Sequence, residues 1–201
     1  MLQLQKRDKQ ILRFLEANKA ITTSQATDIF FNGLTRSSIR RLNQLEDAGI
    51  LKHYTRGKRK VYKLTNEKNH ISEHDMLILD FYSWIYSKGG EVIEYQKNPR
   101  YFNGLLIPDA LFKFRIPYNG ASYKVCVLLE VDLNHYTSNT KMSTMYEKLC
   151  REEVLVDWCE GAEFPVIVLA RPTRGIIYTS DNFNCIYTDL RFTNLYYSIF
   201  E

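Results

Sequence analysis

An apolar strand that ends in two carboxylates constrains the fold of this chain more than any other stretch. Residues 125–132 read VCVLLEVD, and a preceding apolar run reaches them across a turn that contains Asn119-Gly120. This dipeptide is typical of tight hairpin turns. Because side chains alternate along a strand, we expect Glu130 and Asp132 on one face. Two neighbouring carboxylates at the end of a buried strand need a cation or water beside them.

The predicted hairpin brings a third carboxylate to the same place. Asp109 lies in the apolar run 105–114, so we expect it near Glu130 on the neighbouring strand. A helix is predicted next, roughly at Thr140–Cys159, followed by an apolar strand at Phe164–Ala170. Strand, helix and strand after a hairpin predict an α/β plan in which helices cover a sheet.

The rest of the C-terminal part is less informative. Two short strands are predicted at Ile176–Thr179 and Asn184–Thr188. The basic loop 171–174, Arg-Pro-Thr-Arg, either touches a phosphate or is solvated, and we expect the second. The four cysteines of the chain are scattered without a C-x-x-C pair, which favours buried free thiols over disulfides or a zinc site.

The N-terminal part predicts three helices and a hairpin. Apolar residues recur at helical spacing over residues 3–17, and Thr22 or Thr23 is placed to cap a second helix, SQATDIF. Thr35 is placed to cap a third helix, which Gly49 ends. Two alternating segments then predict a pair of strands, at Ile50–Tyr54 and Lys60–Leu64, around a basic turn.

The third helix and the hairpin carry the candidate DNA-contacting residues. Ile39, Leu42 and Leu45 form one narrow apolar stripe on the helix, so we expect its opposite side to face solvent. Long or hydrogen-bonding side chains there are the kind that read base edges, and cations in the hairpin would lie beside a DNA backbone. The candidates are Arg36, Ser37, Arg40, Arg41, Asn43 and Gln44 on the helix, and Arg56, Lys58, Arg59 and Lys60 at the hairpin.

Charge is unevenly distributed along the chain. The net charge is +4, but residues 1–65 carry 14 lysines and arginines against 5 acids, whereas residues 66–201 carry 13 against 18. A basic segment joined to a mildly acidic one indicates that the basic segment binds a polyanion. The alternative is a charged, solvated surface on a helical domain that binds protein.

Three helices followed by a basic hairpin resemble the winged helix-turn-helix of many bacterial regulators, with the pattern L-x-x-L-x-x-x-G-I-L and then K/R-x-Y-x-L. That resemblance implies duplex DNA as the partner, and it makes a homodimer plausible because such regulators present paired recognition helices. We therefore predict an α+β protein of two domains. A winged helix-turn-helix DNA-binding domain spans residues 1–66, a linker spans 67–71, and an α/β domain spans 72–201.

The α/β domain resembles the PD-(D/E)xK nuclease superfamily, which has the restriction-endonuclease-like fold. In that superfamily an Asp after Pro and a Glu on the next strand hold a divalent metal, and a Lys two residues beyond the Glu orients the attacking water. Pro108-Asp109 matches the first element and Glu130 the second, but Asp132 stands where the lysine belongs. Oxygen ligands of this kind suit magnesium or manganese.

With aspartate in place of the lysine, the chain resembles the replication-relaxation family, whose members occur on plasmids, conjugative elements and phages. The resemblance covers about residues 5–170, and its motifs are Pro108-Asp109-Ala110, Leu129-Glu130-Val131-Asp132, Thr137 and Tyr146-Glu147-Lys148-Leu149. Lys141 and Lys148 lie seven positions apart, about two helical turns, so both are placed to face the strand end. Lys148 matches the family motif and is the first candidate for a lysine that replaces the missing one, with Lys141 the second. The alternative is that this lysine only neutralises Asp132 in an ion pair. If the site is active, the resemblance makes Asp109, Glu130 and Asp132 the metal ligands.

Three functions remain open on these grounds. The first is a DNA-binding accessory or regulatory protein of a mobile genetic element, acting in replication, DNA relaxation or transfer, with a degenerate nuclease-like domain. The second is a magnesium- or manganese-dependent DNA endonuclease or nickase targeted by the winged helix. The third is a transcriptional regulator whose second domain senses a ligand. A relaxase or replication protein is a candidate protein partner in the first case.

The expected compartment is the cytoplasm, with no membrane partner. No apolar run approaches the roughly 18 residues that a membrane span requires, and the N-terminus lacks the apolar core of a signal peptide.

Overall fold

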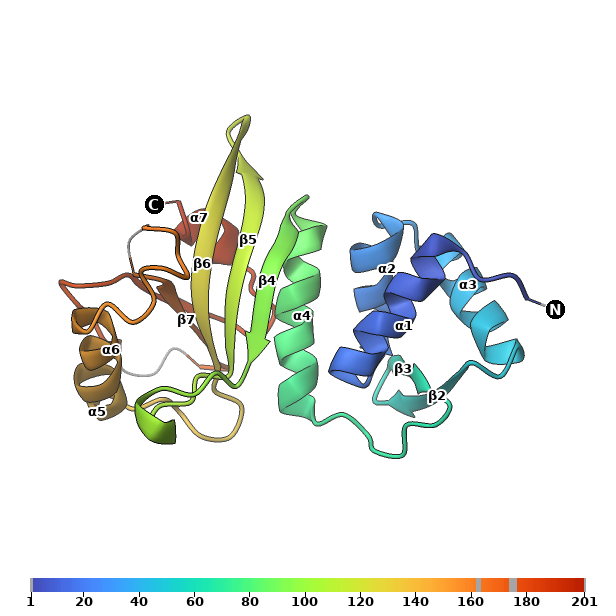
Figure 1. Cartoon of the computed structure of the whole chain (residues 1–201), viewed down its shortest axis with the longest axis horizontal. Coiled ribbons are helices and arrows are strands. Elements are labelled where there is room, and N and C mark those ends of the chain that lie inside the picture. Colours follow the sequence, from blue (N-terminus) through green and yellow to red (C-terminus); the bar gives the residue numbers. More distant parts are fainter. Residues whose placement is uncertain (1, 162–163, 174–176, 201) are drawn as a thin grey trace. The chain divides into compact units, whose positions relative to one another are not determined.

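The computed structural model of the chain divides into two compact units, residues 1–87 and 88–201 (Figure 1). It describes residues 2–161, 164–173 and 177–200. Helices and two sheets, one of them mixed, confirm the predicted α+β class. Within the described residues, the helices lack the length and apolar character that crossing a membrane demands.

The N-terminal unit consists of helices around a small antiparallel sheet of order β1-β3-β2. Ile11, Leu42 and Tyr62 are among the fully buried side chains of its core. In chain order, the elements are α1 (Lys6–Asn18), β1 (Ile21–Thr22), α2 (Thr23–Phe31), α3 (Thr35–Asp47), β2 (Leu51–Arg56), β3 (Arg59–Leu64) and α4 (Glu73–Ser87).

The predicted helices and hairpin are confirmed, with local differences. The Thr22 hydroxyl accepts a hydrogen bond from the backbone N–H of Gln25 and so caps α2. The cap predicted at Thr35 is wrong, because this residue already lies inside α3 and Leu34 precedes the helix without a side-chain hydrogen bond.

The hairpin is longer than predicted, because its strands continue until Arg56 pairs with Arg59. Only Gly57 and Lys58 remain in the turn, and Gly57 has a φ of +57°, a conformation that glycine adopts at little cost. Lys58 therefore lies at the tip of the hairpin.

Helix α4 packs within the N-terminal unit, so the division of the chain differs from the predicted linker at residues 67–71. Met76 and Leu79 join the core of this unit. The Gln25 side-chain amide donates to the Met76 carbonyl at 3.2 Å and to Asp80 Oδ1 at 2.8 Å, which ties α4 to α2.

The C-terminal unit is built on a five-stranded sheet of order β4-β5-β6-β7-β8. Strands β4, β5 and β6 are antiparallel, whereas β6, β7 and β8 are parallel to one another. The elements are β4 (Glu91–Lys97), a 3-10 turn (Phe102–Gly104), β5 (Ala110–Tyr118), β6 (Ala121–Val131), α5 (Asn139–Lys141), a π-helical turn (Met142–Tyr146), α6 (Glu147–Arg151), β7 (Val166–Ala170), β8 (Cys185–Thr188) and α7 (Leu195–Ser198).

The predicted Asn-Gly hairpin is confirmed at the centre of this sheet. Asn119 and Gly120 both have positive φ, +47° and +80°, as a type I′ turn requires. The strands pair without interruption from this turn to Ala110 opposite Leu129. Strand β6 is longer than its parallel neighbour, since pairing with β7 begins only at Val127.

The single helix predicted at Thr140–Cys159 is wrong in its length and regularity. The helical segment runs from Asn139 to Arg151 with a π-helical turn inside it, and turns follow over residues 152–161. Glu153 has a φ of +52°, which a helix does not accommodate. The Thr144 hydroxyl bonds the Thr140 carbonyl at 2.6 Å, a type of contact that bends helices.

The predicted strand at Asn184–Thr188 is confirmed as β8. The strand predicted at Ile176–Thr179 is wrong for residues 177–179, which are irregular, while Ile176 lies outside the described residues. The expectation of buried cysteines is confirmed for Cys126 and Cys159 only, because Cys150 and Cys185 are half-buried; all four are free thiols.

Candidate functional site

Helix α3 presents two arginines on its exposed surface. Arg36 and Arg40 lie one turn apart, so they share a face of the helix. The predicted apolar stripe is only partly correct, because Leu42 and Leu45 are fully buried but Ile39 is 42% exposed. The exposed face of α3 therefore combines two cations with one aliphatic side chain. A surface of this composition is able to contact phosphates and the apolar edge of a base.

Arg41 does not share this exposed face. Its Nε lies 2.9 Å from Asp8 Oδ1 and its Nη2 lies 2.5 Å from Asp8 Oδ2, a bidentate pair in which the carboxylate is fully buried. Burial alone favours the neutral acid, but the hydrogen bond and charge of Arg41 hold the pKa of Asp8 below its usual value. The prediction of Arg41 as a DNA contact is therefore corrected to a structural role that fixes α3 on α1.

Three further candidates on α3 and β3 bond to their own unit. Asn43 Oδ1 accepts hydrogen bonds from Lys60 Nζ at 3.2 Å and from the Tyr62 hydroxyl at 3.1 Å. Lys60 also pairs with Glu46 at 3.3 Å. Gln44 is exposed, and its Oε1 accepts from Arg41 Nη1 at 2.9 Å. Ser37 is half-buried.

Two arginines of the hairpin pair with neighbouring acids of the same unit. Arg56 donates to the Ile71 carbonyl at 2.5 Å and lies 3.5 Å from Glu73. Arg59 lies 2.6 Å from Asp80. Exposed pairs of this kind contribute little and exchange readily, so these arginines remain secondary candidates. Among the residues that the structure describes, Arg36, Arg40 and Lys58 have no ion-pair partner.

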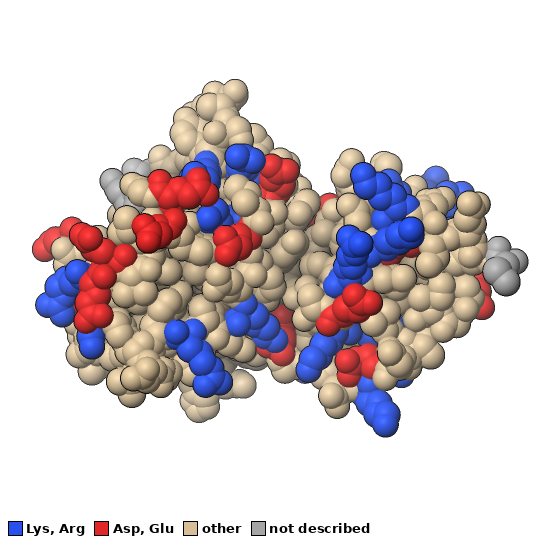
Figure 2. Space-filling model, in the orientation of Figure 1, with Lys and Arg blue, Asp and Glu red and all other residues tan. Residues whose placement is uncertain are grey.

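Acidic residues of α4 reduce the charge contrast between the two parts of the chain. The N-terminal unit carries 15 lysines and arginines against 9 acids, a net +6, and the C-terminal unit carries 12 against 14, a net −2. Figure 2 shows acidic side chains between the basic ones on the visible face of the N-terminal unit. Its positive potential therefore depends on a few unpaired cations more than on the total.

The acidic cluster of the C-terminal unit lies where β5 begins and β6 ends. Glu130 is 4% exposed, and its Oε1 lies 2.5 Å from Lys141 Nζ. The buried Tyr146 hydroxyl donates to the same carboxylate oxygen. Asp109 Oδ2 accepts from the backbone N–H of Val131 at 2.6 Å, which confirms that the hairpin brings Asp109 to this end of β6.

Burial dominates the electrostatics of Glu130. Loss of water raises the pKa of Glu130 to about 7, the charge of Lys141 opposes this rise, and the nearby carboxylate of Asp109 adds to it. Burial, followed by the charge of Glu130, also raises the pKa of Tyr146, so this hydroxyl stays protonated and donates. Near neutral pH the Glu130 carboxyl is therefore partly protonated.

Asp132 is paired with a cation that the sequence did not indicate. Its Oδ1 accepts from the Thr137 backbone N–H at 2.9 Å and the Thr137 hydroxyl at 2.8 Å. Arg171 Nη2 lies 2.6 Å from Asp132 Oδ2. This contact is an ion pair, but its angles do not satisfy the geometry of a hydrogen bond. Arg171 is 4% exposed and packs on Tyr136 and Tyr187. The expected solvated loop is therefore wrong at Arg171, while Arg174 lies outside the described residues.

Lys141, rather than Lys148, reaches the carboxylates. Lys148 Nζ lies over the Phe102 ring and 3.7 Å from Glu152, with its side chain 45% exposed. The first choice for a helix lysine that replaces the missing one is therefore wrong, and the second choice is the residue that contacts Glu130. Five positions separate Lys141 from Tyr146, which in a regular helix would leave them about 140° apart. The π-helical turn between them allows both to reach Glu130.

The motif Tyr146-Glu147-Lys148-Leu149 divides its roles among different neighbours. Tyr146 bonds Glu130 and Leu149 is fully buried in the core. Glu147 accepts hydrogen bonds from three side chains of the segment 178–182, at 2.7 to 2.8 Å: the Tyr178 hydroxyl, the Ser180 hydroxyl and the Asn182 amide. It therefore fastens this segment to α6.

The acidic cluster does not fit a divalent metal. Each of the three candidate ligands, Asp109, Glu130 and Asp132, has a protein donor on a carboxylate oxygen, and two of them face a lysine or an arginine. In the part of the chain that the structure describes, no group of three or more His, Cys, Asp or Glu side chains is placed to hold a metal ion. A cation site would require Lys141 and Arg171 to leave.

Two residues of the cluster received no role from the sequence: Arg171, and Tyr146, which was named only as part of a family motif. The signal for Tyr146 is its position five residues after Lys141, but only the π-helical turn makes that spacing meaningful. The signal for Arg171 is its place directly after an apolar strand, like Asp132. Comparisons with family models, curated proteins and solved structures find no match to this chain.

Proposed function

We propose that this chain is a DNA-binding accessory or regulatory protein, whose N-terminal unit holds duplex DNA and whose C-terminal unit carries a degenerate nuclease-like site. One observation carries the proposal: Arg36 and Arg40 lie exposed on one face of α3, and Lys58 lies at the tip of the hairpin. The resemblance to the replication-relaxation family suggests the process in which the protein acts, which is the replication, DNA relaxation or transfer of a mobile element.

The order of elements in the N-terminal unit supports the DNA-binding part. Helices α2 and α3 are followed by the β2–β3 hairpin, and β1 joins the same sheet, as a winged helix-turn-helix requires. In that plan α3 enters the major groove. Arg36 and Arg40 would contact phosphates or base edges there, while Lys58 would follow the backbone.

The topology of the C-terminal unit supports a nuclease-like origin. An antiparallel meander, a helical crossover and a parallel strand bring Asp109 and Glu130 to one end of the sheet. The partners of these carboxylates favour the degenerate form. Lys141 and Arg171 supply the positive charge beside Glu130 and Asp132 that a metal would otherwise bring.

The decisive experiment compares two double variants of equal charge. Arg36→Ala with Arg40→Ala removes both cations from α3, while Lys9→Ala with Arg13→Ala removes two exposed cations, also four apart, from α1. Fluorescence anisotropy on a labelled mixed-sequence duplex at low salt measures affinity. We expect the α3 variant to bind on the order of 10- to 100-fold more weakly and the α1 variant to lose far less. Equal losses would refute a contact through α3.

A second candidate, a metal-dependent DNA endonuclease, is favoured by one contact. Lys141 reaches Glu130, as a relocated catalytic lysine would. Incubation with supercoiled plasmid and manganese tests it. The proposed function expects no nicking; nicking that disappears in Lys141→Ala and persists in Lys148→Ala would establish the nuclease instead.

A further inference from the structure

The proposed function makes no use of a pair of buried cysteines in the C-terminal unit. Cys126 lies on β6 and Cys159 lies in the turn segment 152–161, and both belong to the cluster that packs on one face of the sheet. They are 9% and 1% exposed. The two thiols are neighbours in this cluster, and the interaction between them is the largest influence on the pKa of each.

Two lysines flank Cys126 on this face of the sheet. Lys113 is its direct partner across the β5–β6 pair, and Lys124 lies two positions earlier on β6, so all three side chains share one side. Glu160, the neighbour of Cys159, lies 3.2 Å from Lys113 and also pairs with Lys124. These ion pairs hold the turn segment with Cys159 over Cys126.

The surroundings give the two thiols different chemistry. Contact with Cys159, opposed by burial and helped by the charges of Lys113 and Lys124, lowers the pKa of Cys126. The same contact, with burial, raises the pKa of Cys159. We assign Cys126 as the nucleophile of the pair because Lys113 and Lys124 flank it, and neighbouring positive charge favours the reactive thiolate.

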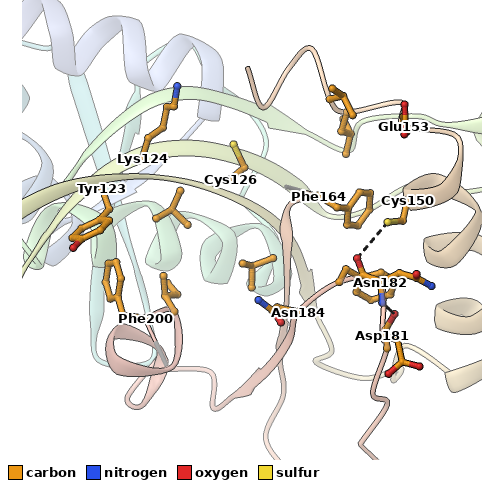
Figure 3. A pocket seen from close by; sticks show the side chains of 17 residues that line it. Tyr123, Lys124, Cys126, Cys150, Glu153, Phe164, Asp181, Asn182, Asn184 and Phe200 are labelled. Carbon is orange, nitrogen blue, oxygen red and sulfur yellow. Dashed lines mark hydrogen bonds between the residues drawn. The ribbon is translucent and has the colours of Figure 1, made fainter. Parts of the chain in front are cut away.

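A cavity of about 840 Å³ connects Cys126 with solvent. Cys126 and Lys124 line it from β6, and Phe164, which lies just before β7, lines it as well (Figure 3). Cys150 lines the same cavity and is the more exposed thiol, but burial raises its pKa. A small oxidant that enters this cavity can therefore reach Cys126 and Cys150. Cys126 differs from Cys150 in having Cys159 as its neighbour.

We propose that Cys126 and Cys159 are a redox modification site, at which a peroxide converts the two thiols into a reversible disulfide. The Cys126 thiolate attacks one peroxide oxygen, so that an S–O bond forms, the O–O bond breaks and hydroxide leaves. Cys159 then attacks the sulfur of this sulfenic acid and gives up its proton, an S–S bond forms, the S–O bond breaks, and water leaves. Two electrons pass from the thiols to one peroxide.

The test treats the folded, reduced chain with one equivalent of hydrogen peroxide, blocks remaining thiols by alkylation, and maps peptides by mass spectrometry. We expect a Cys126–Cys159 linked peptide that a dithiol reductant removes, with Cys150 and Cys185 alkylated. In a separate alkylation without oxidant, Cys126 should react roughly tenfold faster than Cys150, despite its lower exposure. Fastest labelling of Cys150 would contradict the proposal.

Two variants separate the chemistry from mere proximity. In Cys159→Ser the linked peptide should vanish and Cys126 should carry a sulfenic acid, detected by a dimedone adduct. Lys124→Gln should slow the oxidation several-fold while far-ultraviolet circular dichroism stays unchanged, and Lys148→Gln serves as the control of equal charge. A linked peptide that forms only in urea, or equal rates in both lysine variants, would overturn the inference.

Discussion

At the scale of single residues, the partner of a charge decides its role, and the partner is often distant in sequence. Arg40 and Arg41 are adjacent and chemically identical, yet Arg40 is exposed while Arg41 is held by Asp8, 33 positions earlier. Helical periodicity places residues on a face within about one turn. It does not reveal a buried acid on another helix, which is why the sequence-based set of DNA contacts included both arginines.

Arg41→Ala should therefore act on stability. Removing the guanidinium leaves the buried Asp8 carboxylate without its cation, so we expect the N-terminal unit to lose about 3 kcal/mol in free energy of unfolding. Urea unfolding followed by circular dichroism measures this loss. Arg40→Ala, the adjacent control, should stay within about 0.5 kcal/mol of the parent chain, and similar losses in both variants would contradict the assignment.

Glu130 should make the folded protein less stable as pH rises, whereas a carboxylate whose pKa is lowered by folding makes it more stable. The pKa of Glu130 rises from 4.5 in the unfolded chain to about 7 in the folded one, so between these values the folded state binds a proton that the unfolded state has lost. Stability from this group is present below about pH 4.5 and falls as pH rises through 7, by an amount on the order of 3 kcal/mol.

Glu130→Gln isolates this contribution because glutamine has the same shape and does not titrate. The difference in unfolding free energy between parent and variant, measured by urea titration at several pH values, should shift in favour of the variant from pH 4.5 to pH 7. Parallel curves would show that Glu130 keeps an ordinary pKa when folded.

At the scale of elements, strands followed from the sequence more reliably than the helix behind them. The apolar runs and the Asn119-Gly120 turn carry their own register, since a slip of one residue would expose every buried side chain. The helix after Thr137 lacks such a constraint. Its π-helical turn lets Lys141 and Tyr146 both meet Glu130 of β6, and the irregular residues 152–161 are held by ion pairs of Glu160 with Lys113 and Lys124, contacts that helical periodicity does not encode.

Deleting one exposed residue of the π-helical turn, Ser143, should convert it into regular helix. Lys141 and Tyr146 would then be four residues apart, about 40° around a regular helix, so we expect both to keep their contacts with Glu130. The pKa of Glu130 should therefore stay near its parent value of about 7. Carboxyl carbon chemical shifts followed against pH by NMR measure it; a midpoint that rises in the deletion variant would show that the π-helical turn itself is needed to position Lys141.

At the scale of the whole molecule, unpaired cations matter more than net charge. Seven lysines and arginines belong to the predicted DNA contacts, but four of them bond acids of their own unit: Arg41, Arg56, Arg59 and Lys60. Composition revealed the excess of positive charge over the first 65 residues. It did not reveal that Glu73 and Asp80 of α4 neutralise Arg56 and Arg59 and so reduce the excess of positive charge in this unit.

The salt dependence of DNA binding should count the cations that contact phosphate. If Arg36, Arg40 and Lys58 make these contacts, the logarithm of the association constant should fall with the logarithm of salt concentration at a slope of about −3 per chain. Engagement of all seven cations would give about −6. Anisotropy titrations between about 50 and 200 mM salt distinguish the two, and Arg36→Ala with Arg40→Ala should reduce the slope to about −1.

The β5–β6 hairpin also implies an order of events during folding. Its strands meet through the Asn119-Gly120 turn, whereas β6 must wait for β7 to arrive from Val166, 39 positions after its partner Val127. Local pairing closes first because its loop is short. The carboxylates on the hairpin therefore gather before Arg171 can neutralise them. If Arg171 joins the structure after the rate-limiting step, Arg171→Met should accelerate unfolding in stopped-flow measurements while the refolding rate stays nearly constant. A slower refolding rate would contradict this order.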